Sequence, residues 1–393
     1  MSSLCFIVES GADVRLVEGL AERFDLTIVA RRIEGGVEIS HPPAETVPTT
    51  IGPASRIKFA VFVWKHLTSN AGKIDRVLVQ GYGLAALAAN VVGRLKGIKT
   101  TMIVCSPAEA YYQCRKLYPD KLKPFRLREL FLIKFIAWLN AFVGRDYIVL
   151  SEFLAETVRS RRRRAAVSVI PVYGVDTDLF KVTTEPKHEI RRRLALPSSG
   201  ALIFFSSRVA PEKDAHTLLG AFKILRDRGR DVWLLHRSGG HQTFLCDAAR
   251  YGVEDRVIAG DAYHPQHQLP SAYQASDLCV QASRAEGLGF SPLEALACGV
   301  PVVAASVGGL CETIIDGVTG WSYSLGDASD LASRIEEALD NEAEAARRTA
   351  DGRDLVLKKY NKALVFQALK TRLTDFDRLR AEAENPGSVE MRT

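Results

Sequence analysis

The sequence of 393 residues lacks a long uninterrupted apolar segment. A helix that crosses a bilayer needs about 18 apolar residues in a row, and no run approaches that length. The first residues, MSSLCFIVES, also lack the basic stretch and the apolar core of a secretion signal, and Leu4 to Val8 has the pattern of a first β-strand. These absences predict a soluble, cytoplasmic protein.

Paired cysteines are absent as well. The seven cysteines are odd in number and scattered, and no two are spaced as CxxC. This usage fits a reducing compartment better than a disulfide framework. The eight histidines do not fall into a metal-binding spacing either. We therefore expect neither a structural disulfide nor a metal cofactor.

Charge is unevenly distributed along the chain. Residues 1–170 contain 25 Lys and Arg against 15 Asp and Glu, whereas the remainder contains 27 against 31. The charged fraction of 25% and the apolar fraction of 47% are those of a globular protein. No nucleic-acid-reading motif accompanies the basic excess, so we expect no nucleic-acid partner.

Short apolar segments rich in Val, Ile and Leu alternate with longer helix-like stretches. Continuous apolar strands separated by helices are typical of parallel sheets that are covered on both faces. The pattern predicts an α/β protein with two doubly wound domains. The predicted strands are LCFIV, RVLVQ, TTMIV, YIVL and VSVI in the first half, and LIFF, VWLL, RVIA, LCVQ and PVVA in the second.

The domain boundary is expected between Pro171 and about Pro197, where three prolines interrupt helical periodicity. We assign residues 1–180 to an N-terminal domain and residues 181–360 to a C-terminal domain. Residues 361–393 are expected to form a helix that returns to the N-terminal domain, followed by a frayed tail.

The segment EGLGFSPLEALACGVPVVA contains the clearest local signals. A glycine loop follows the strand Leu278 to Val280 and leads into a helix. Ser291 is the expected N-cap, Pro292 the first helical residue and Glu294 the partner of Ser291 in a capping box. A strand, a glycine loop and a helix N-terminus at the carboxyl edge of a parallel sheet together form an anion site.

Two acidic and two basic residues make this region a candidate substrate site. Glu286 and Glu294 bracket the loop with seven residues between them, and carboxylates there suit hydroxyl groups. Arg208 and Lys213 follow the strand Leu202 to Phe205, and such a pair commonly holds a diphosphate. Taken singly, each could be no more than a helix cap or a solvated surface charge.

Four segments resemble, in the same order, those of GT-B fold retaining glycosyltransferases of family GT4. Residues Glu286 to Ala304 resemble the E-x7-E segment, and SSRVAPEKD resembles G-R-x-x-x-E-K-G with Ser207 and Asp214 in place of the two glycines. VSVIPVYGVDTDLF is similar to the interdomain linker, with Tyr173 where asparagine is usual, and SVGGLCETIIDGVTGW to the stretch after the nucleotide site. The resemblance is close over residues 167–182 and 202–325 and loose over the N-terminal half.

The resemblance implies two Rossmann-like domains that face each other across a cleft, and it implies roles for individual residues. Arg208 and Lys213 would hold the donor diphosphate, Glu286 the transferred sugar and Glu294 the ribose. Glu286, Arg208 and Lys213 are therefore the expected catalytic residues. The expected donor-binding set also includes Gly287, Leu288, Gly289, Phe290, Tyr263 and Gly11.

The acceptor side is less defined by the sequence. Ser10 and Gly11 correspond to the glycine loop of the family, although an ordinary strand-to-helix turn explains them equally well. Many members carry a histidine after the fourth N-terminal strand, where this chain reads VCSPAEAYY, so Ser106 and Glu109 are the candidate substitutes. Gly81 and Tyr82 would also face the acceptor.

Two further motifs are expected to be uninformative. The DTD at Asp176 to Asp178 resembles the metal-binding DxD of another glycosyltransferase fold, but it lies inside the linker segment. QGYGLAALAAN resembles a dinucleotide-binding loop, but the next strand ends at Ser106 without the acidic residue that would hold a ribose.

Residues 115–142 combine six Lys and Arg with the apolar helix LFLIKFIAWLNAF. Three interpretations remain open: a buried core helix, an oligomer interface, and a surface that rests on anionic lipid. The chain is thus expected to be a glycosyltransferase that moves a hexosyl or N-acetylhexosaminyl group, with a UDP-sugar favoured over a GDP-sugar as donor. A GT-B fold nucleotide-sugar epimerase and a non-catalytic glycan-binding subunit are the alternatives.

Overall fold

The computed structural model describes residues 2–32, 47–117, 125–162, 164–261 and 268–374. Internal contacts divide the chain into two units. Unit 1 comprises Met1–Glu109, Arg126–Tyr173 and Val365–Thr393, and unit 2 comprises Ala110–Phe125 and Gly174–Leu364. These limits differ from the predicted domains chiefly because Ala110–Phe125, from the first half of the chain, groups with unit 2.

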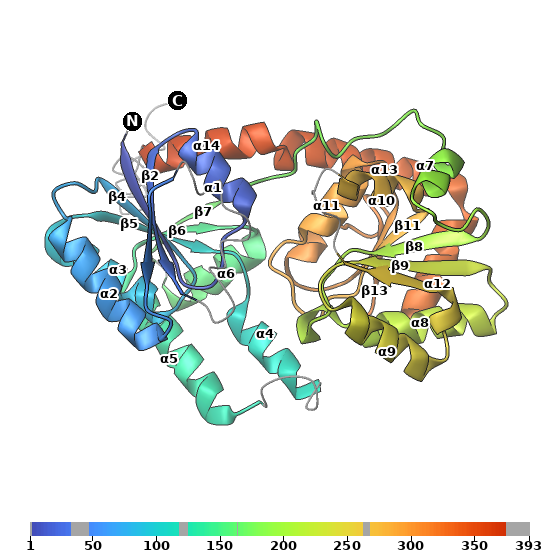
Figure 1. The fold of residues 1–393 in the computed structure, drawn as a ribbon, viewed down its shortest axis with the longest axis horizontal. Coiled ribbons are helices and arrows are strands. Elements are labelled where there is room, and N and C mark those ends of the chain that lie inside the picture. The colour runs from blue at the N-terminus through green and yellow to red at the C-terminus, as the bar shows by residue number, and fades with distance from the viewer. Residues whose placement is uncertain (1, 33–46, 118–124, 163, 262–267, 375–393) are drawn as a thin grey trace. The chain divides into compact units, whose positions relative to one another are not determined.

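Unit 1 is built on a seven-stranded sheet in the order β3-β2-β1-β4-β5-β6-β7. Every neighbouring pair in it is parallel. The strand order reverses between β1 and β4. Figure 1 shows this sheet, with β2, β4, β5, β6 and β7 labelled. The strands are β1 (Ser3–Val8), β2 (Asp25–Arg31), β3 (Thr49–Gly52), β4 (Arg76–Gln80), β5 (Lys99–Val104), β6 (Asp146–Val149) and β7 (Ala166–Val169).

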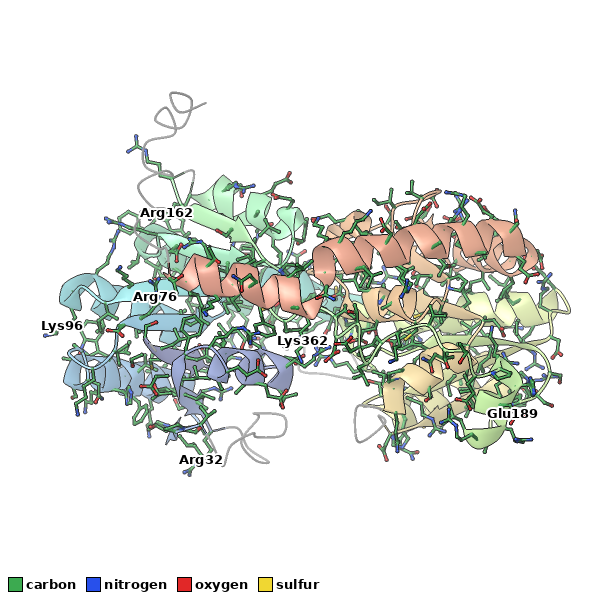
Figure 2. All side chains as sticks on the ribbon, turned by 90° about the horizontal axis from the view of Figure 1, so that it is seen from above. Arg32, Arg76, Lys96, Arg162, Glu189 and Lys362 are labelled. Atoms are coloured by element: carbon green, nitrogen blue, oxygen red, sulfur yellow. The ribbon has the colours of Figure 1, made fainter. Side chains whose placement is uncertain are left out.

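The helices of unit 1 alternate with these strands. Three of them lie in a row, with α3 in contact with both α2 and α5. Lys96 ends α3 and projects from the surface of unit 1 (Figure 2). The helices are α1 (Val14–Ala21), α2 (Arg56–Ser69), α3 (Leu84–Lys96), α5 (Leu127–Val143) and α6 (Glu152–Arg161), while α4 (Ala108–Cys114) and η1 (Arg115–Leu117) lead into unit 2.

Unit 2 contains a six-stranded sheet in the order β10-β9-β8-β11-β12-β13. All of its pairs are parallel, and its strand order reverses between β8 and β11. The strands are β8 (Ala201–Phe205), β9 (Val232–Arg237), β10 (Val257–Gly260), β11 (Leu278–Gln281), β12 (Val302–Ala305) and β13 (Trp321–Tyr323).

Helices cover both faces of the sheet of unit 2, and further helices form the C-terminal segment. They are α7 (Lys187–Arg193), η2 (Pro211–Lys213), α8 (Ala215–Asp227), α9 (His241–Tyr251), η3 (Glu254–Arg256), α10 (Leu269–Ala275), α11 (Phe290–Ala297), η5 (Gly308–Glu312), α12 (Ala328–Asp340), α13 (Glu342–Leu355), η6 (Val356–Tyr360) and α14 (Lys362–Thr374). The fold is therefore α/β with two parallel, Rossmann-like sheets, as the sequence predicts.

All ten strands predicted from apolar runs are present, because a strand that is buried on both faces needs apolar side chains throughout. Three strands were not predicted. β2 pairs between β1 and β3, whereas β3 and β13 lie at sheet edges and have only four and three residues. Such short segments are too brief to show a periodic pattern.

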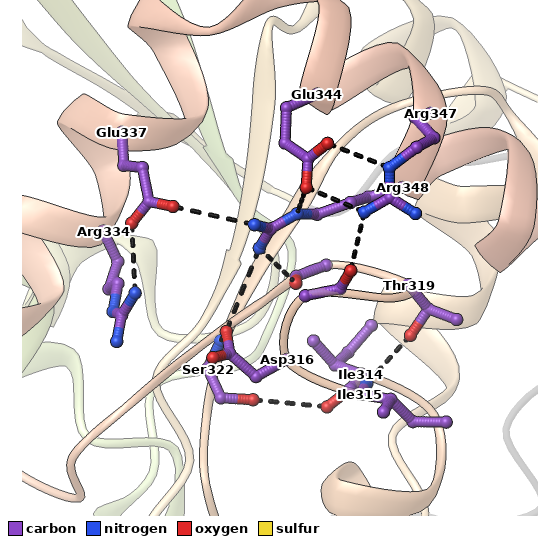
Figure 3. Close-up of polar contacts among 12 residues, drawn as sticks. Ile314, Ile315, Asp316, Thr319, Ser322, Arg334, Glu337, Glu344, Arg347 and Arg348 are labelled. Atoms are coloured by element: carbon purple, nitrogen blue, oxygen red, sulfur yellow. Dashed lines mark hydrogen bonds and ion pairs between the residues drawn. The ribbon is translucent and has the colours of Figure 1, made fainter.

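A buried arginine holds the end of the unit 2 sheet against the C-terminal helices (Figure 3). Arg348 on α13 is 8% exposed and lies over the ring of Trp321 on β13 at 4.2 Å. Its guanidinium donates to Glu344 Oε1 at 2.7 Å and to the carbonyl oxygen of Gly320 at 3.0 Å. The planar guanidinium thereby joins stacking to hydrogen bonding, which a lysine could not do.

A second buried ion pair fixes α14 to unit 1. Arg372 on α14 donates to Asp146 on β6, and both side chains are almost fully buried. Arg372 also donates to Ser168 Oγ at 2.6 Å, and Thr101 donates to the same carboxylate from β5. Burial raises the pKa of Asp146 although Arg372 opposes the shift. Each of the two charges is therefore stable inside unit 1 only while its partner is present.

We predict that Arg372→Ala lowers the free energy of unfolding by ~3–5 kcal/mol, because it leaves the Asp146 carboxylate buried without its cation. Urea unfolding followed by tryptophan fluorescence measures the loss. Lys370→Ala, an exposed change on the same helix, is the control and should change stability by less than ~0.5 kcal/mol. Equal losses of stability in the two variants would contradict a stabilising role of the Arg372–Asp146 pair.

Candidate active site in unit 2

The candidate site lies where the strand order of unit 2 reverses. β8 and β11 are neighbours, and the chain leaves them toward opposite ends of the sheet. In parallel sheets the crevice outside the carboxyl ends of such strands is where ligands bind. Arg208 and Lys213 follow β8, and Glu286 and Glu294 follow β11. The topology therefore brings the four predicted residues to one edge.

Lys213 and Glu286 form the centre of the site. Lys213 Nζ lies 2.5 Å from Glu286 Oε2, and the two side chains are only 15% and 10% exposed. Ser283 Oγ and Gln281 Nε2 donate to the same oxygen at 3.0 and 3.3 Å. Burial alone would raise the pKa of Glu286, but Lys213 and the hydrogen bonds from Ser283 and Tyr111 outweigh it and lower the pKa. Glu286 is thus held as a carboxylate.

Tyr111 completes the surroundings of Glu286. Its hydroxyl donates to Glu286 Oε1 at 3.3 Å, and both residues belong to unit 2. Burial, together with the charges of Glu286 and Glu212, raises the pKa of Tyr111 far above its ordinary value. The phenol therefore stays protonated and occupies a hydrogen-bonding position that a ligand hydroxyl could take instead.

Arg208 is more exposed than Lys213. Its guanidinium lies 2.7 Å from Glu212 Oε1, and its side chain is 64% exposed, whereas that of Glu212 is 9% exposed. The buried carboxylate holds one side of the guanidinium fork, and most of the arginine remains accessible. This arrangement orients a cation toward the edge of the sheet without burying it.

The two departures from the family's glycine pattern have local compensations. Asp214 adopts a left-handed backbone conformation, with a φ of 48°, which aspartate tolerates better than most residues. Its side chain caps α8 by accepting from the backbone N–H of Thr217 and from the Thr217 hydroxyl. Ser207 donates to Gln281 Oε1 at 3.0 Å, which links the β8 loop to the residues that hold Glu286.

The glycine loop after β11 is tightly enclosed. Gly289 has a φ of 94°, and a Cβ at that position would approach Leu310 to 2.5 Å. The backbone N–H of Gly309 donates to the carbonyl oxygen of Glu286 at 3.1 Å. The predicted residues Gly287, Leu288 and Gly289 are buried here, and Phe290 begins α11. Glycine is required at position 289 because φ is positive there and Leu310 leaves no room for a side chain.

The predicted capping box is wrong. α11 begins at Phe290 with Gly289 as N-cap, so Ser291 lies inside the first turn. The positive φ of Gly289 turns the chain into the helix earlier than the serine signal suggested. Glu294, 5% exposed, accepts instead from the hydroxyl of Tyr273 on α10 at 3.1 Å. Glu294 is thus held by Tyr273 of α10 and does not take part in a capping box with Ser291.

Sequence reasoning missed the residues that position the two glutamates. Gln281 and Ser283 stand beside Glu286 in the sequence and could have been noticed as polar residues at the end of a buried strand. Tyr111 and Tyr273 offered no such signal. Tyr111 is 175 residues from Glu286, and the two meet only because Tyr111 groups with unit 2.

The other predicted site residues are placed at the carboxyl edge of the unit 1 sheet. Gly11 follows β1, Gly81 and Tyr82 follow β4, and Ser106 and Glu109 follow β5. Glu109 Oε1 pairs with Arg161 at 2.5 Å, and the Arg161 guanidinium lies 6.0 Å from the centre of the Tyr82 ring. Tyr263 lies outside the described residues.

No group of three or more His, Cys, Asp or Glu side chains in the described ranges could hold a metal ion. In the DTD segment, Asp176 accepts from the backbone N–H groups of Asp178 and Leu179 and pairs with Lys362 Nζ at 3.2 Å. All seven cysteines are free thiols. None of the described helices has the length and apolar character to span a bilayer.

Residues 186–354 match the family model described as "Glycosyl transferases group 1". This segment contains β8 to β13 and all four central residues of the site. This match covers less than half of the chain.

Similar curated proteins are named as glycosyltransferases too. The 2-deoxystreptamine glucosyltransferase of Streptomyces kanamyceticus is 28% identical over 72% of this chain and 73% of its own length. The D-inositol 3-phosphate glycosyltransferase of Thermobispora bispora is 35% identical over 43% of this chain, and the match spans only 41% of that relative. The chain is thus a glycosyltransferase, whose acceptor these relatives do not define.

Solved structures share the fold of this glycosyltransferase. Sucrose-phosphate synthase from Thermosynechococcus elongatus gives a TM-score of 0.77 at 21% identity and covers 96% of this chain and 100% of its own. HepE of Anabaena, solved with UDP-glucose, gives a TM-score of 0.75 at 18% identity and covers 95% of this chain and 100% of its own. The two Rossmann-like sheets are those of the GT-B fold.

Proposed function

We propose that the chain is a retaining glycosyltransferase that moves a hexosyl or N-acetylhexosaminyl group from a nucleotide diphosphate sugar to an acceptor. The observation that supports this most is the buried Lys213–Glu286 pair, which lies beside Arg208 at the β8/β11 switch point. A UDP-sugar is the favoured donor and a GDP-sugar the second, and we expect no metal requirement.

In this proposal the donor replaces contacts that the protein makes with itself. The diphosphate would take Lys213 and Arg208, and hydroxyl groups of the transferred sugar would donate to Glu286 where Lys213 and Tyr111 now do. Glu294 would hold the ribose. Glu286 is already ionised and held by its neighbours, so its carboxylate is preorganised for the ligand.

The proposed mechanism follows from the charge that develops. Cleavage at the anomeric carbon leaves an oxocarbenium-like sugar and adds negative charge to the departing diphosphate. Lys213 and Arg208, together with the N-terminus of α11, would stabilise that charge most in the transition state. The acceptor would attack on the side of the leaving group, and the phosphate would take its proton, so no protein nucleophile is proposed.

We predict that Lys213→Ala lowers turnover by ~10²-fold or more, because a preorganised charge at the diphosphate is lost. The wild-type nucleotide is found first by thermal shift with UDP, GDP and ADP, since a ligand at 100 times its Kd adds ~2.7 kcal/mol. Lys223→Ala removes an exposed lysine of α8 and should leave turnover unchanged. Wild-type turnover in Lys213→Ala would overturn the assignment.

The same assay separates the alternatives. An epimerase would invert its nucleotide-sugar without an acceptor, and Glu286→Ala would leave that reaction intact. A non-catalytic subunit would bind glycan without consuming any donor. The complete set of Arg208, Lys213, Glu286 and Glu294 favours the enzyme over this last alternative.

We also propose that unit 1 contacts an anionic membrane surface, which adds a partner that the sequence left open. The alternative of a buried core helix at residues 127–143 is wrong, because α5 buries only Ala137, Asn140 and Ala141. Its other side forms an exposed row of rings, in which neighbouring centroids are 6.0–6.4 Å apart. The row consists of Phe131, Phe135, Trp138 and Phe142, which are 46–69% exposed.

The charge of the neighbouring helices supports lipid as the partner. Seven exposed Lys and Arg lie on α2, α3 and α5, against one glutamate, Glu129. The cations are Arg56, Lys58, Lys65, Arg94, Lys96, Arg128 and Lys134. Exposed apolar residues also continue onto α2, at Ile57, Val61 and Trp64. A second copy of this face would repel the first, whereas anionic headgroups attract Lys and Arg and admit aromatic rings.

We predict that Phe131→Ser combined with Trp138→Ser weakens binding to phosphatidylcholine vesicles containing phosphatidylglycerol at least tenfold in co-sedimentation. Tenfold corresponds to only ~1.4 kcal/mol, less than one buried aromatic ring contributes. Leu325→Ser removes an exposed apolar side chain of unit 2 and serves as the control. Absence of vesicle binding by the wild type would exclude the membrane. A concentration-dependent dimer that the double variant abolishes would instead make this face an oligomer interface.

A further inference from the structure

The sheet of unit 1 has its own switch point, at which the sequence predicted Gly11, Gly81 and Tyr82 but not Glu9. β1 and β4 are neighbours there, and the loops that follow them are Glu9 to Gly11 and Gly81 to Gly83. Such an edge is a ligand-binding position in parallel sheets. Its chemistry is therefore informative about the sugar acceptor that the proposed function requires.

Glu9 occupies the N-terminus of α3. Its carboxylate is 8% exposed, and Oε2 accepts from the backbone N–H of Ala85 at 3.4 Å. Gly83 is the N-cap of this 13-residue helix, and a Cβ there would lie 1.9 Å from Glu9 Oε2. The missing side chain of Gly83 leaves the space that the carboxylate fills. A helix N-terminus that attracts an anion is thus satisfied by the protein's own carboxylate.

This arrangement explains physically why the glycine loop of QGYGLAALAAN is unsuited to a phosphate. A phosphate at the first turn of α3 would have to displace Glu9 or approach it closely, and the two negative charges repel each other. The loop has the glycines of an anion site, but its anion is already present.

The cations near this edge are engaged as well. Arg56 Nε lies 3.5 Å from Glu9 Oε1, and Arg31 donates to the carbonyl oxygens of Glu9 and Ala54 at 2.8 and 2.7 Å. Arg15 pairs with Asp13, and Arg161 pairs with Glu109. A phosphate would have to compete with a carboxylate or a carbonyl oxygen for each of these guanidinium groups.

Two further polar atoms at the end of β4 lack partners. Gln80 Oε1 and Tyr82 Oη are enclosed and make no hydrogen bond within the described part of the chain. Between them Gly81 has a φ of 84°, and no heavy atom lies within 4 Å of where its Cβ would be. Both oxygens can accept a hydrogen bond, as the Glu9 carboxylate does, and the Tyr82 hydroxyl can also donate one. The edge is therefore rich in hydrogen-bond acceptors and calls for a ligand that donates.

We infer that Glu9 is a specificity-determining residue, which closes the N-terminus of α3 to phosphate so that the sugar acceptor enters the β1/β4 edge with hydroxyl or ammonium groups. The inference rests on the proposed function, because it concerns the acceptor of that reaction. The chemical class is an unphosphorylated polyol or amino polyol at this end of the acceptor, whatever the acceptor carries elsewhere.

The test uses the full chain saturated with the nucleotide that stabilises it, so that phosphate cannot bind at the unit 2 site. Inorganic phosphate is then titrated, and the melting temperature is followed. Wild type and Glu18→Ala, which removes an exposed carboxylate of α1, should show no phosphate-dependent rise. Glu9→Ala should bind phosphate at least tenfold more tightly than wild type, and Glu9→Gln, which fills the same space, should gain less.

A matched pair of ligands tests the chemical class directly. In the same nucleotide-saturated state, wild type should bind D-inositol 3-phosphate no more tightly than myo-inositol. Glu9→Ala should favour the phosphate ester at least tenfold over the parent polyol. A sulfate soak of Glu9→Ala crystals should place the anion at the backbone N–H groups that begin α3.

Three results would overturn the inference: phosphate bound at α3 in wild type, a tenfold wild-type preference for the phosphate ester, or no gain of anion binding in Glu9→Ala despite a change in stability. The last result would reduce Glu9 to a structural helix cap. Failure of every nucleotide to stabilise wild type would instead refute the proposed donor site, while the sulfate soak would still report on Glu9.

Discussion

The ion pair between Lys213 and Glu286 is the interaction on which the proposed chemistry of unit 2 depends. A lysine and a glutamate that are both this buried are stable only as a pair, because removal of either would leave an uncompensated charge. The pair keeps both charges at the sheet edge in the absence of substrate. A diphosphate and a sugar would each bind one member and so compensate both.

The surrounding residues make that exchange specific. Ser283 and Gln281 both donate to Glu286 Oε2, so the carboxylate keeps its orientation when Lys213 turns toward another anion and a sugar hydroxyl takes the place of Tyr111. Ser207 extends the network to the β8 loop through Gln281. Ser207 and Asp214 stand where the family pattern has glycines. Both make hydrogen bonds in the loop after β8, so they do not argue against a functional enzyme.

The strands and the central charges could be predicted from the sequence because each depends on a local pattern. Apolar runs define strands buried on both faces, and a strand followed by charged residues places those charges at the carboxyl edge. Contacts between distant segments could not be predicted in this way. Tyr111 reaches Glu286 only through the fold, and Glu9 acts as the anion of a helix that begins 75 residues later in the chain. The capping box failed because the left-handed glycine at Gly289 outweighed the serine signal.

The carboxyl edges of the two sheets carry opposite charges at their helix N-termini. At the unit 2 edge, cations are poised beside a glycine loop and a helix N-terminus, which suits a diphosphate. At the unit 1 edge, Glu9 fills the helix N-terminus, which suits a ligand with hydrogen-bond donors. The asymmetry fits the proposed division into a donor site and an acceptor site, since the donor must bring a diphosphate.

A crystal structure of the chain with an intact nucleotide-sugar tests the central claim most directly. The account predicts that Lys213 Nζ leaves Glu286 and lies within hydrogen-bonding distance of a diphosphate oxygen, while Glu286 accepts from the sugar. A bound diphosphate that touches neither Lys213 nor Arg208, with the Lys213–Glu286 pair unbroken, would contradict it.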